Sequence, residues 1–183
     1  MKLVKKLPLI QYIIYSAVIL GGVALDQLTK LLSVLFLKNI DTCPLISGVL
    51  HLTYIENRGA AFGMLADDRW VFLTVSTVTI IVVGALLYLG QIEGVHYGIA
   101  LSMILSGGIG NMIDRIALGY VVDFIDFRLI NFAVFNGADS FICVGAGLMI
   151  LFLVRDIIHE SKAKGAPASA EVPTSENEGE QND

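Results

Sequence analysis

The sequence predicts an all-α integral membrane protein with four transmembrane helices, a small extracytoplasmic β-sheet and an apolar interfacial segment. Hydrophobic residues make up 55% of its 183 residues, charged residues make up 16%, and the mean hydropathy is +0.74. A chain of this size and composition is too apolar for a soluble domain. Spanning about 30 Å of hydrocarbon takes about 20 helical residues. The apolar runs long enough to do so cover approximately residues 9–29, 71–89, 95–113 and 138–155.

The first apolar run follows a short basic start and ends in polar residues. Lys2, Lys5 and Lys6 before an apolar stretch superficially fit a secretory signal peptide. However, the run leads into Asp26 and Lys30 without a convincing small-x-small cleavage site. We therefore predict that it is a retained first helix.

The second and third runs differ in composition. The second carries no charged residue, which makes it the clearest span. The third contains four glycines, and small residues allow neighbouring helix backbones to approach closely. Residues 90–94 join the two runs, and their length predicts a tight hairpin.

Basic residues near the chain ends indicate the orientation of the spans. Three lysines precede the first run, and Arg155, Lys162 and Lys164 follow the last one. Because cytoplasmic segments are enriched in Lys and Arg, we expect both termini to be cytoplasmic. The opposite side carries as many basic residues, but Lys30, Arg58 and Arg115 among them lie in polar motifs where function can override the bias.

Two long connections then fall on the outer side. In the first, residues 31–70, the segment 49–56 alternates apolar and polar residues, which is typical of a half-buried strand. In the second, residues 114–137, the segment 121–135 is unusually apolar for a loop. We expect a small sheet on the membrane surface and an apolar segment that dips into the interface.

Most of the net charge of −5 belongs to the C-terminal end. The tail from residue 161 to 183 contains five acidic residues and two lysines, which leaves −2 for the rest of the chain. It is poor in hydrophobic residues, and we predict a disordered acidic cytoplasmic tail after a membrane-embedded domain at residues 1–160. The domain has no basic stripe of the kind that binds phosphates, so nucleic acid is not an expected partner.

Ionisable residues at membrane depth need a reason, because each costs about 2.5 to 3.5 kcal/mol at the centre of a transmembrane helix. Asp26 and Lys30 are four residues apart near the end of the first run, where they can form an ion pair. The simplest interpretation is a pair that anchors the helix end at the interface. Asn57 follows the predicted strand, and the small residues after it would let backbone groups approach a ligand.

The end of the third run carries a second polar group. Asn111 and Arg115 lie four residues apart on one helical face, and Asp114 lies beside them. Taken alone, this pattern fits a glycine-packed helix end with a neutralised charge pair.

Asp123 and Asp139 are the strongest candidates for catalysis. Asp139 opens the fourth run, where a carboxylate is also favoured as an N-terminal helix residue. Asp123 has no such explanation, because aliphatic and aromatic residues surround it. In a shared-proton pair of carboxyls, the ionised one takes a proton from water and the protonated one supports the scissile carbonyl. We predict that these two residues form an aspartic peptidase pair, and we expect no metal site or cofactor.

Two other functions are compatible with parts of this pattern. A lipid phosphotransferase or phosphatase could use the aspartates to hold Mg²⁺. A transporter could line a polar path with Asp26, Lys30, Asp114 and Arg115, although these residues lie near the ends of the runs and a transport path favours the bilayer midplane.

Five motifs in order give a more specific indication. The sequences DQLTK, NRGAAFG, GGIGNMIDR, GYVVDF and FNGADS, from Asp26 to Ser140, resemble those of the bacterial lipoprotein signal peptidases, also called signal peptidase II or prolipoprotein signal peptidases. The resemblance implies an aspartic endopeptidase of the cytoplasmic (inner) membrane, with its active site toward the outer face. Such enzymes remove signal peptides from diacylglyceryl-modified prolipoproteins and cut just before the lipidated cysteine.

The resemblance also implies residue roles and partners. Asp123 and Asp139 match the catalytic pair, and Gly137 departs from the branched apolar residue common at that position. The implied partners are the lipidated precursors, membrane lipid and globomycin-type inhibitors, with no cofactor. The positions that match substrate-binding or supporting residues are Asn111, Arg115, Asn136, Asp114, Asn57, Asp26 and Lys30.

Overall fold

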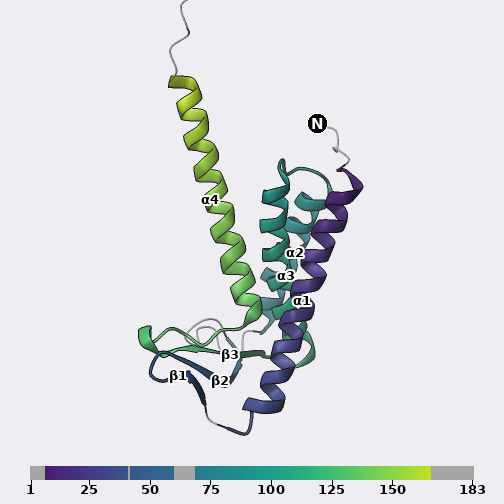
Figure 1. Ribbon diagram of the computed structural model, residues 1–183. Helices are drawn as coiled ribbons and strands as arrows, with labels where there is room; N and C mark the ends of the chain where they lie inside the picture. Colours follow the sequence, from purple (N-terminus) through teal and green to yellow (C-terminus); the bar gives the residue numbers. More distant parts are fainter. Residues whose placement is uncertain (1–6, 41, 60–68, 166–183) are drawn as a thin grey trace, which may run out of the picture.

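The computed structural model describes residues 7–40, 42–59 and 69–165. Within these ranges, long helices stand side by side and a three-stranded sheet lies across one end of them (Figure 1). The elements are α1 (Leu9–Leu37), β1 (Cys43–Ile46), β2 (Leu50–Asn57), α2 (Arg69–Tyr88), α3 (Val95–Ala117), β3 (Val121–Phe127), the 3-10 helix η2 (Arg128–Ile130) and α4 (Gly137–Gly165).

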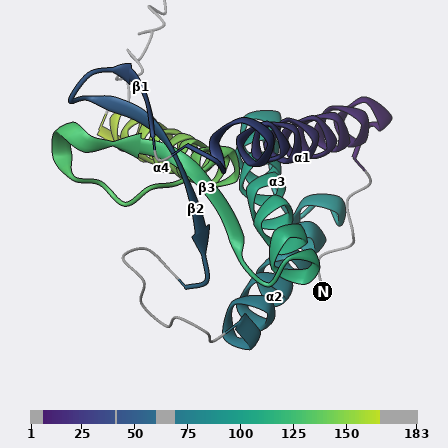
Figure 2. The same cartoon turned by 90° about the horizontal axis from the view of Figure 1, so that it is seen from below.

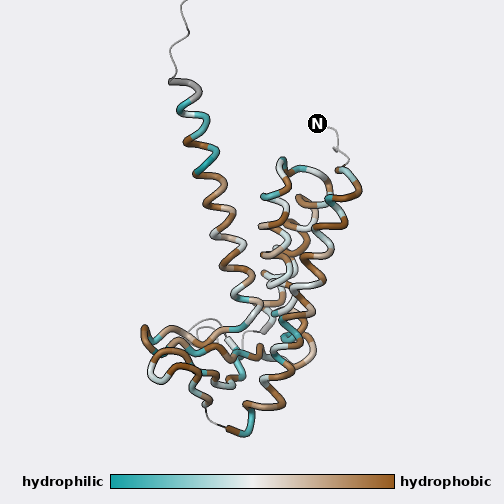
Figure 3. Tube along the Cα trace, in the orientation of Figure 1, coloured by the Kyte–Doolittle hydropathy of each residue, from teal (hydrophilic) through white to brown (hydrophobic). Residues whose placement is uncertain are grey.

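Three helices of the described residues are long and apolar enough to cross a membrane. They are α1, residues Trp70–Tyr88 of α2 and residues Gly137–Lys162 of α4. Figure 3 shows hydrophobic residues along most of α1 and along the half of α4 that lies nearer the sheet. The prediction of four spans is therefore confirmed for three helices only, because α3 is less apolar than the others.

The lower hydropathy of α3 follows from its position. It packs against α1, α2 and α4, and Figure 2 shows it among these three helices. Its buried residues include Ser102, Ser106, Gly107 and Asn111. A helix whose small and polar residues face other helices needs fewer apolar side chains than a helix surrounded by lipid.

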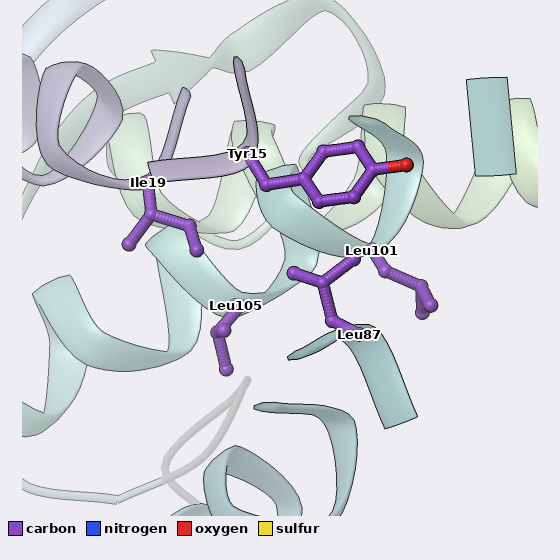
Figure 4. Packing of buried hydrophobic residues seen from close by; sticks show 5 residues of the cluster. All are labelled: Tyr15, Ile19, Leu87, Leu101 and Leu105. Atoms are coloured by element: carbon purple, nitrogen blue, oxygen red, sulfur yellow. The ribbon is translucent and has the colours of Figure 1, made fainter. Parts of the chain in front are cut away.

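Apolar packing between α1, α2 and α3 forms the core. Figure 4 shows the cluster, in which side chains from these three helices meet. Gly98 of α3 lies directly against the ring of Tyr15, so that a side chain at this position would overlap the ring. The buried members of the cluster are Tyr15, Ile19, Leu87, Leu101 and Leu105.

The helices extend beyond the apolar runs that predict them. The first continues to Leu37, so that Asp26 and Lys30 lie inside α1 and not at its end. The interpretation of this pair as an interfacial anchor is therefore wrong. The two side chains pair with each other, Lys30 also pairs with Asp114 of α3, and the helix continues past them for about two turns. The fourth helix continues to Gly165, so residues 161–165, which the sequence predicts to be the start of the disordered tail, are helical. Residues 166–183 lie outside the described residues.

The sheet has the order β1-β2-β3 with both pairs antiparallel. The strand predicted at residues 49–56 is confirmed as β2, in which Ile55 pairs with Asp123 of β3. The apolar segment 121–135 forms β3, η2 and a return loop whose Phe135 pairs with Ile125. Its first half is buried within the protein, whereas the second half exposes large hydrophobic side chains, among them Leu129, Ile130 and Phe132. Only the second half therefore fits an interfacial segment.

Candidate active site

Asp123 and Asp139 reach the same cavity from different elements. Asp123 lies in β3, where its side chain is buried, and Asp139 lies in the first turn of α4. Both residues line a cavity of about 560 Å³. Thus residues that are 16 positions apart in sequence come together because β3 and the start of α4 meet at the end of α3.

Two asparagine amides join these carboxylates. Asn136 donates from Nδ2 to Oδ1 of Asp123 at 2.6 Å, and Asn111 donates from Nδ2 to Oδ1 of Asp139 at 2.7 Å. Nδ2 of Asn136 also donates to Oδ1 of Asn111 at 3.1 Å. The resulting chain of hydrogen bonds runs without interruption from one aspartate to the other.

The start of α4 fixes the position of Asp139. The side chain of Asn136 accepts a hydrogen bond from the backbone N–H of Asp139 at 3.0 Å, and the Asp139 carboxylate accepts one from the backbone N–H of Asn136 at 3.2 Å. These reciprocal bonds have the pattern of a capping box, with Asn136 as the cap. Asp139 is therefore both a helix-capping residue and part of the cavity, so the two interpretations of this residue are compatible.

Asp123 has an unusual protonation equilibrium. Burial raises the pKa of its carboxyl to about 6, although a hydrogen bond donated by Asn57 at 2.8 Å partly opposes this shift. The negative charge of Asp139 raises the pKa further, and the hydrogen bond from Asn136 lowers it. At mildly acidic pH the side chain of Asp123 can thus hold a proton while it faces the cavity.

A buried ionic cluster lies behind the two aspartates. Lys30 pairs with Asp26 at 2.9 Å and with Asp114 at 3.0 Å, and all three side chains are at most 4% exposed. Its Nζ also donates to Oδ1 of Asn111 at 2.9 Å. Gln27 completes the cluster, because its Nε2 donates to Oδ1 of Asp114 at 2.9 Å. The sequence did not predict this role of Gln27, because an amide within the DQLTK motif does not by itself indicate a contact with Asp114.

The same cluster connects the elements that carry the aspartates. Asp26 accepts a hydrogen bond from the backbone N–H of Ala138 at 2.8 Å, which ties α1 to the start of α4. Asp114 accepts one from the backbone N–H of Val122 at 3.1 Å, which ties α3 to β3. Gly107 and Gly110 make this close approach possible, because a side chain on either would overlap Ala138 or Asp26. This explains the spacing of glycines in GGIGN.

Arg115 provides a cation at the cavity wall. Its guanidinium lies 4.9 Å from the ring centre of Phe72 in α2 and donates to the backbone oxygen of Asn111 at 3.5 Å. The predicted site residues Asn57, Asn111 and Arg115 all line the cavity. Asn136, Asp114, Asp26 and Lys30 support it from behind through the hydrogen bonds and ion pairs described above.

Asp126, the other carboxylate of β3, belongs to a different network. It accepts hydrogen bonds from Thr53 and from Arg128, each at 2.8 Å. Thr42 contacts both donors, because its hydroxyl lies 3.0 Å from that of Thr53 and accepts from Arg128 at 3.2 Å. The nearby His51 contacts Thr42 and accepts from the backbone N–H of Gly48. Asp126 and His51 therefore contribute to the sheet rather than to the cavity wall.

Comparison with known proteins decides the family. A sequence profile described as "Signal peptidase (SPase) II" matches residues 18–155. The chain belongs to the signal peptidase II family. All five motifs from Asp26 to Ser140 fall within the matched residues, so the resemblance noted from the sequence is confirmed.

Relatives with the description "Lipoprotein signal peptidase" cover most of the chain. The protein from Clostridioides difficile (strain 630) is 40% identical over 152 residues, which is 82% of this chain and 99% of the relative. The protein from Caldanaerobacter subterraneus subsp. tengcongensis is 50% identical over 136 residues, which is 71% of this chain and 90% of the relative. The corresponding identity for Brevibacillus brevis is 44% over 146 residues, 79% of this chain and 95% of the relative.

Solved structures support the fold of this family member. Two bacterial membrane enzymes, determined by the in meso method at 2.3 Å and 1.9 Å resolution, match with TM-scores of 0.73 and 0.70. The first is 28% identical and covers 86% of this chain and 94% of the solved chain. The second is 30% identical and covers 78% and 93%, respectively. Signal peptidase II membership makes the chain a peptidase, and its apolar helices place it in a bacterial membrane.

Proposed function

We propose that this chain is an aspartic endopeptidase of the bacterial inner membrane that removes signal peptides from diacylglyceryl-modified prolipoproteins and cuts just before the lipidated cysteine. Family membership supports the substrate class. The observation that supports the aspartic mechanism is the amide bridge through Asn111 and Asn136, which links Asp123 to Asp139 at one cavity.

The two carboxyls take complementary roles in the proposed reaction. The ionised Asp139 removes a proton from water as the water oxygen attacks the scissile carbonyl carbon. The protonated Asp123 transfers its proton to the carbonyl oxygen, which becomes a hydroxyl in the tetrahedral intermediate. When the C–N bond breaks, the proton on Asp139 passes to the leaving nitrogen, and Asp123 recovers its proton from the hydroxyl. The enzyme thus returns to its starting state without a cofactor.

The assignment of base and acid follows from the surroundings. We assign the base to Asp139 because Lys30 and Arg115 both contact Asn111, whose amide donates to this carboxylate. Asp123 is 2% exposed, and burial favours its neutral form. The two groups titrate as a coupled pair, so each pH limb of the reaction belongs to the pair as a whole.

The cavity suits a lipid-anchored peptide. Its walls include Phe72 from α2, Val144 from α4 and Phe135 from the return loop, so apolar side chains surround the polar floor. Since α2 and α4 both contain candidate membrane spans, a substrate held by its own signal helix can approach from the lipid. The same walls would accept an apolar peptide inhibitor of the globomycin type.

The proposed orientation places the site toward the outer face. Figure 1 shows the sheet at the end of the helices opposite the N-terminus and opposite the far end of α4. If the basic residues near both termini face the cytoplasm, the sheet and the cavity face outward. This is the side on which a translocated lipoprotein precursor presents its cleavage site.

Cleavage of a diacylglyceryl-modified precursor by purified variants tests the proposal. We expect Asp123→Asn and Asp139→Asn each to lose about 10² to 10⁴ of kcat/KM, because each removes a proton-transfer group. Asp126→Asn is the matched control from the same strand and should retain most activity. Near-wild-type cleavage by a variant at either proposed catalytic position would refute the mechanism, as would loss of all activity after exhaustive chelation of divalent metals.

A further inference from the structure

Lys30 is a fully buried lysine next to the proposed catalytic pair, but it does not reach either catalytic carboxylate by a direct hydrogen bond or ion pair in the described residues. Its side chain is 4% exposed. An ammonium group has three donors. Two of them face Asp26 and Asp114, at 2.9 and 3.0 Å. The third donates to Oδ1 of Asn111 at 2.9 Å.

The contact with Asn111 determines how this amide is turned. Oδ1 of Asn111 accepts from Lys30 and from Nδ2 of Asn136, so both donors hold the oxygen on the same side. The NH₂ group of Asn111 must then point away from them, and it donates to Oδ1 of Asp139 at 2.7 Å. In the flipped orientation, the amide oxygen would face the Asp139 carboxylate, and Lys30 and Asn136 would face an NH₂ group that cannot accept their hydrogen bonds.

We propose that Lys30 is a positioning residue that locks the Asn111 amide with its NH₂ group toward Asp139 and thereby keeps the negative charge of the catalytic pair on that residue. This inference rests on the proposed aspartic mechanism. Hydrogen bonds donated to a carboxylate favour its ionised form. Lys30 therefore acts selectively on Asp139 through Asn111, whereas its positive charge also acts on Asp123.

Charged groups from four elements surround this arrangement, and the test must separate their effects. If Lys30 alone is replaced, the buried carboxylates of Asp26 and Asp114 lose their cation, which can disturb folding. Replacing Lys30 and Asp26 together by neutral residues keeps the net charge of the cluster at its original value of −1. Charged or titratable groups that face the cluster or the pair are Asp26 in α1, Asp114 and Arg115 in α3, Asp123 in β3 and Asp139 in α4.

The experiment measures kcat/KM against pH for the full chain with a lipidated precursor. The variants are Lys30→Met and the charge-matched double variant Lys30→Met with Asp26→Asn, with Lys38→Met as the control. Lys38 is half exposed and pairs with Glu56 at 3.3 Å, away from the cavity. Thermal unfolding of each variant identifies those that remain folded, and the double variant provides the test if the single variant does not fold.

We expect the acidic limb of the pH profile to move to higher pH by about one unit or more in Lys30→Met. The double variant should keep part of this shift, because it still lacks the donor that locks Asn111. Lys38→Met should leave the profile unchanged. A folded variant with a uniform loss at every pH and no shift would overturn the inference. A wild-type limb in the double variant would also overturn it, since charge neutralisation would then be the only role of Lys30.

Different results would refute the role of Lys30 and the proposed mechanism. If Asp139→Asn remains active, the mechanism itself is wrong and Lys30 has no pair to act on. If the variants at Asp123 and Asp139 are inactive while the acidic limb of the folded Lys30 variants does not move, the mechanism stands and only the role of Lys30 is wrong.

Discussion

Asp123 and Asp126 lie in the same strand, three residues apart, and have opposite environments. Asp123 accepts hydrogen bonds from two asparagine amides at the cavity, and burial raises its pKa to about 6. Burial also raises the pKa of Asp126, but hydrogen bonds from Arg128 and Thr53 outweigh burial and hold that pKa below its ordinary value. Deeper burial with neutral amide donors thus leaves the Asp123 carboxyl able to hold a proton, whereas Arg128 and Thr53 keep Asp126 ionised. One strand thus carries both the proposed acid and a structural anion.

Removal of the amide between the two proposed catalytic residues should have the largest effect on activity. Asn136 is fully buried and contacts Asp123, Asn111 and Asp139. We expect Asn136→Ala to lower kcat/KM by about 10² or more, because Asp123 loses a donor, the backbone N–H of Asp139 loses its acceptor, and the amide link to Asn111 is broken. Thr53→Ala, which removes a donor from Asp126, should lower it several-fold at most. Equal losses in the two variants, both folded by thermal unfolding, would contradict the distinct roles of the two networks.

The pH dependence of kcat/KM tests whether Asp123 is the acid. The proposed acid must be protonated, so kcat/KM should fall as the pH rises through an alkaline limb that belongs to the coupled pair and depends on the pKa of Asp123, about 6. Asn57 donates to the ionised form of Asp123 and lowers its pKa. We therefore expect Asn57→Ala to move the alkaline limb to higher pH. A limb that stays in place, or moves to lower pH, would argue against Asp123 as the acid.

The smallest expected effect is that of Asp126 on the stability of the fold. Asp126→Asn should lower the free energy of unfolding by about 1 kcal/mol or less, because Arg128 is partly exposed and solvent screens the pair. Because the folded pKa of Asp126 is lowered, this stabilisation is present above the ordinary value of 3.8 and is lost as the pH falls through the folded value. Thermal unfolding at pH 7 and pH 3 measures the difference. An equal difference between wild type and variant at both pH values would show that the ion pair is not its source.

Composition and periodicity predicted the membrane spans and the strand β2 from the sequence. The same measures did not predict the length of α1. Charged residues after an apolar run indicate the end of a transmembrane helix unless their partners are known, and the partner of Lys30 in α3 is visible only in the structure. The character of α3 was also missed. It is less apolar because helices cover it, and a single sequence does not show which helix is central.

The sequence likewise predicted some residues of the site and missed others. The position of Asp123 and Asp139 in apolar sequence indicated that they are candidates for catalysis. Only the resemblance to signal peptidase II distinguished Asp123 from Asp126. The structure supplies the physical distinction, since Arg128 follows Asp126 by two residues and pairs with it. Gln27 and the orientation of Asn111 depend on contacts between residues more than 80 positions apart, which spacing along the chain does not reveal.

A double-mutant cycle across the proposed catalytic pair tests the central claim most directly. It compares single-turnover cleavage of a lipidated precursor by wild type, Asp123→Asn, Asp139→Asn and the double variant. If the two residues act as one unit on the same water, the double variant should be no slower than the slower single variant. Losses that multiply in the double variant would show that the residues act independently and would contradict a shared catalytic pair.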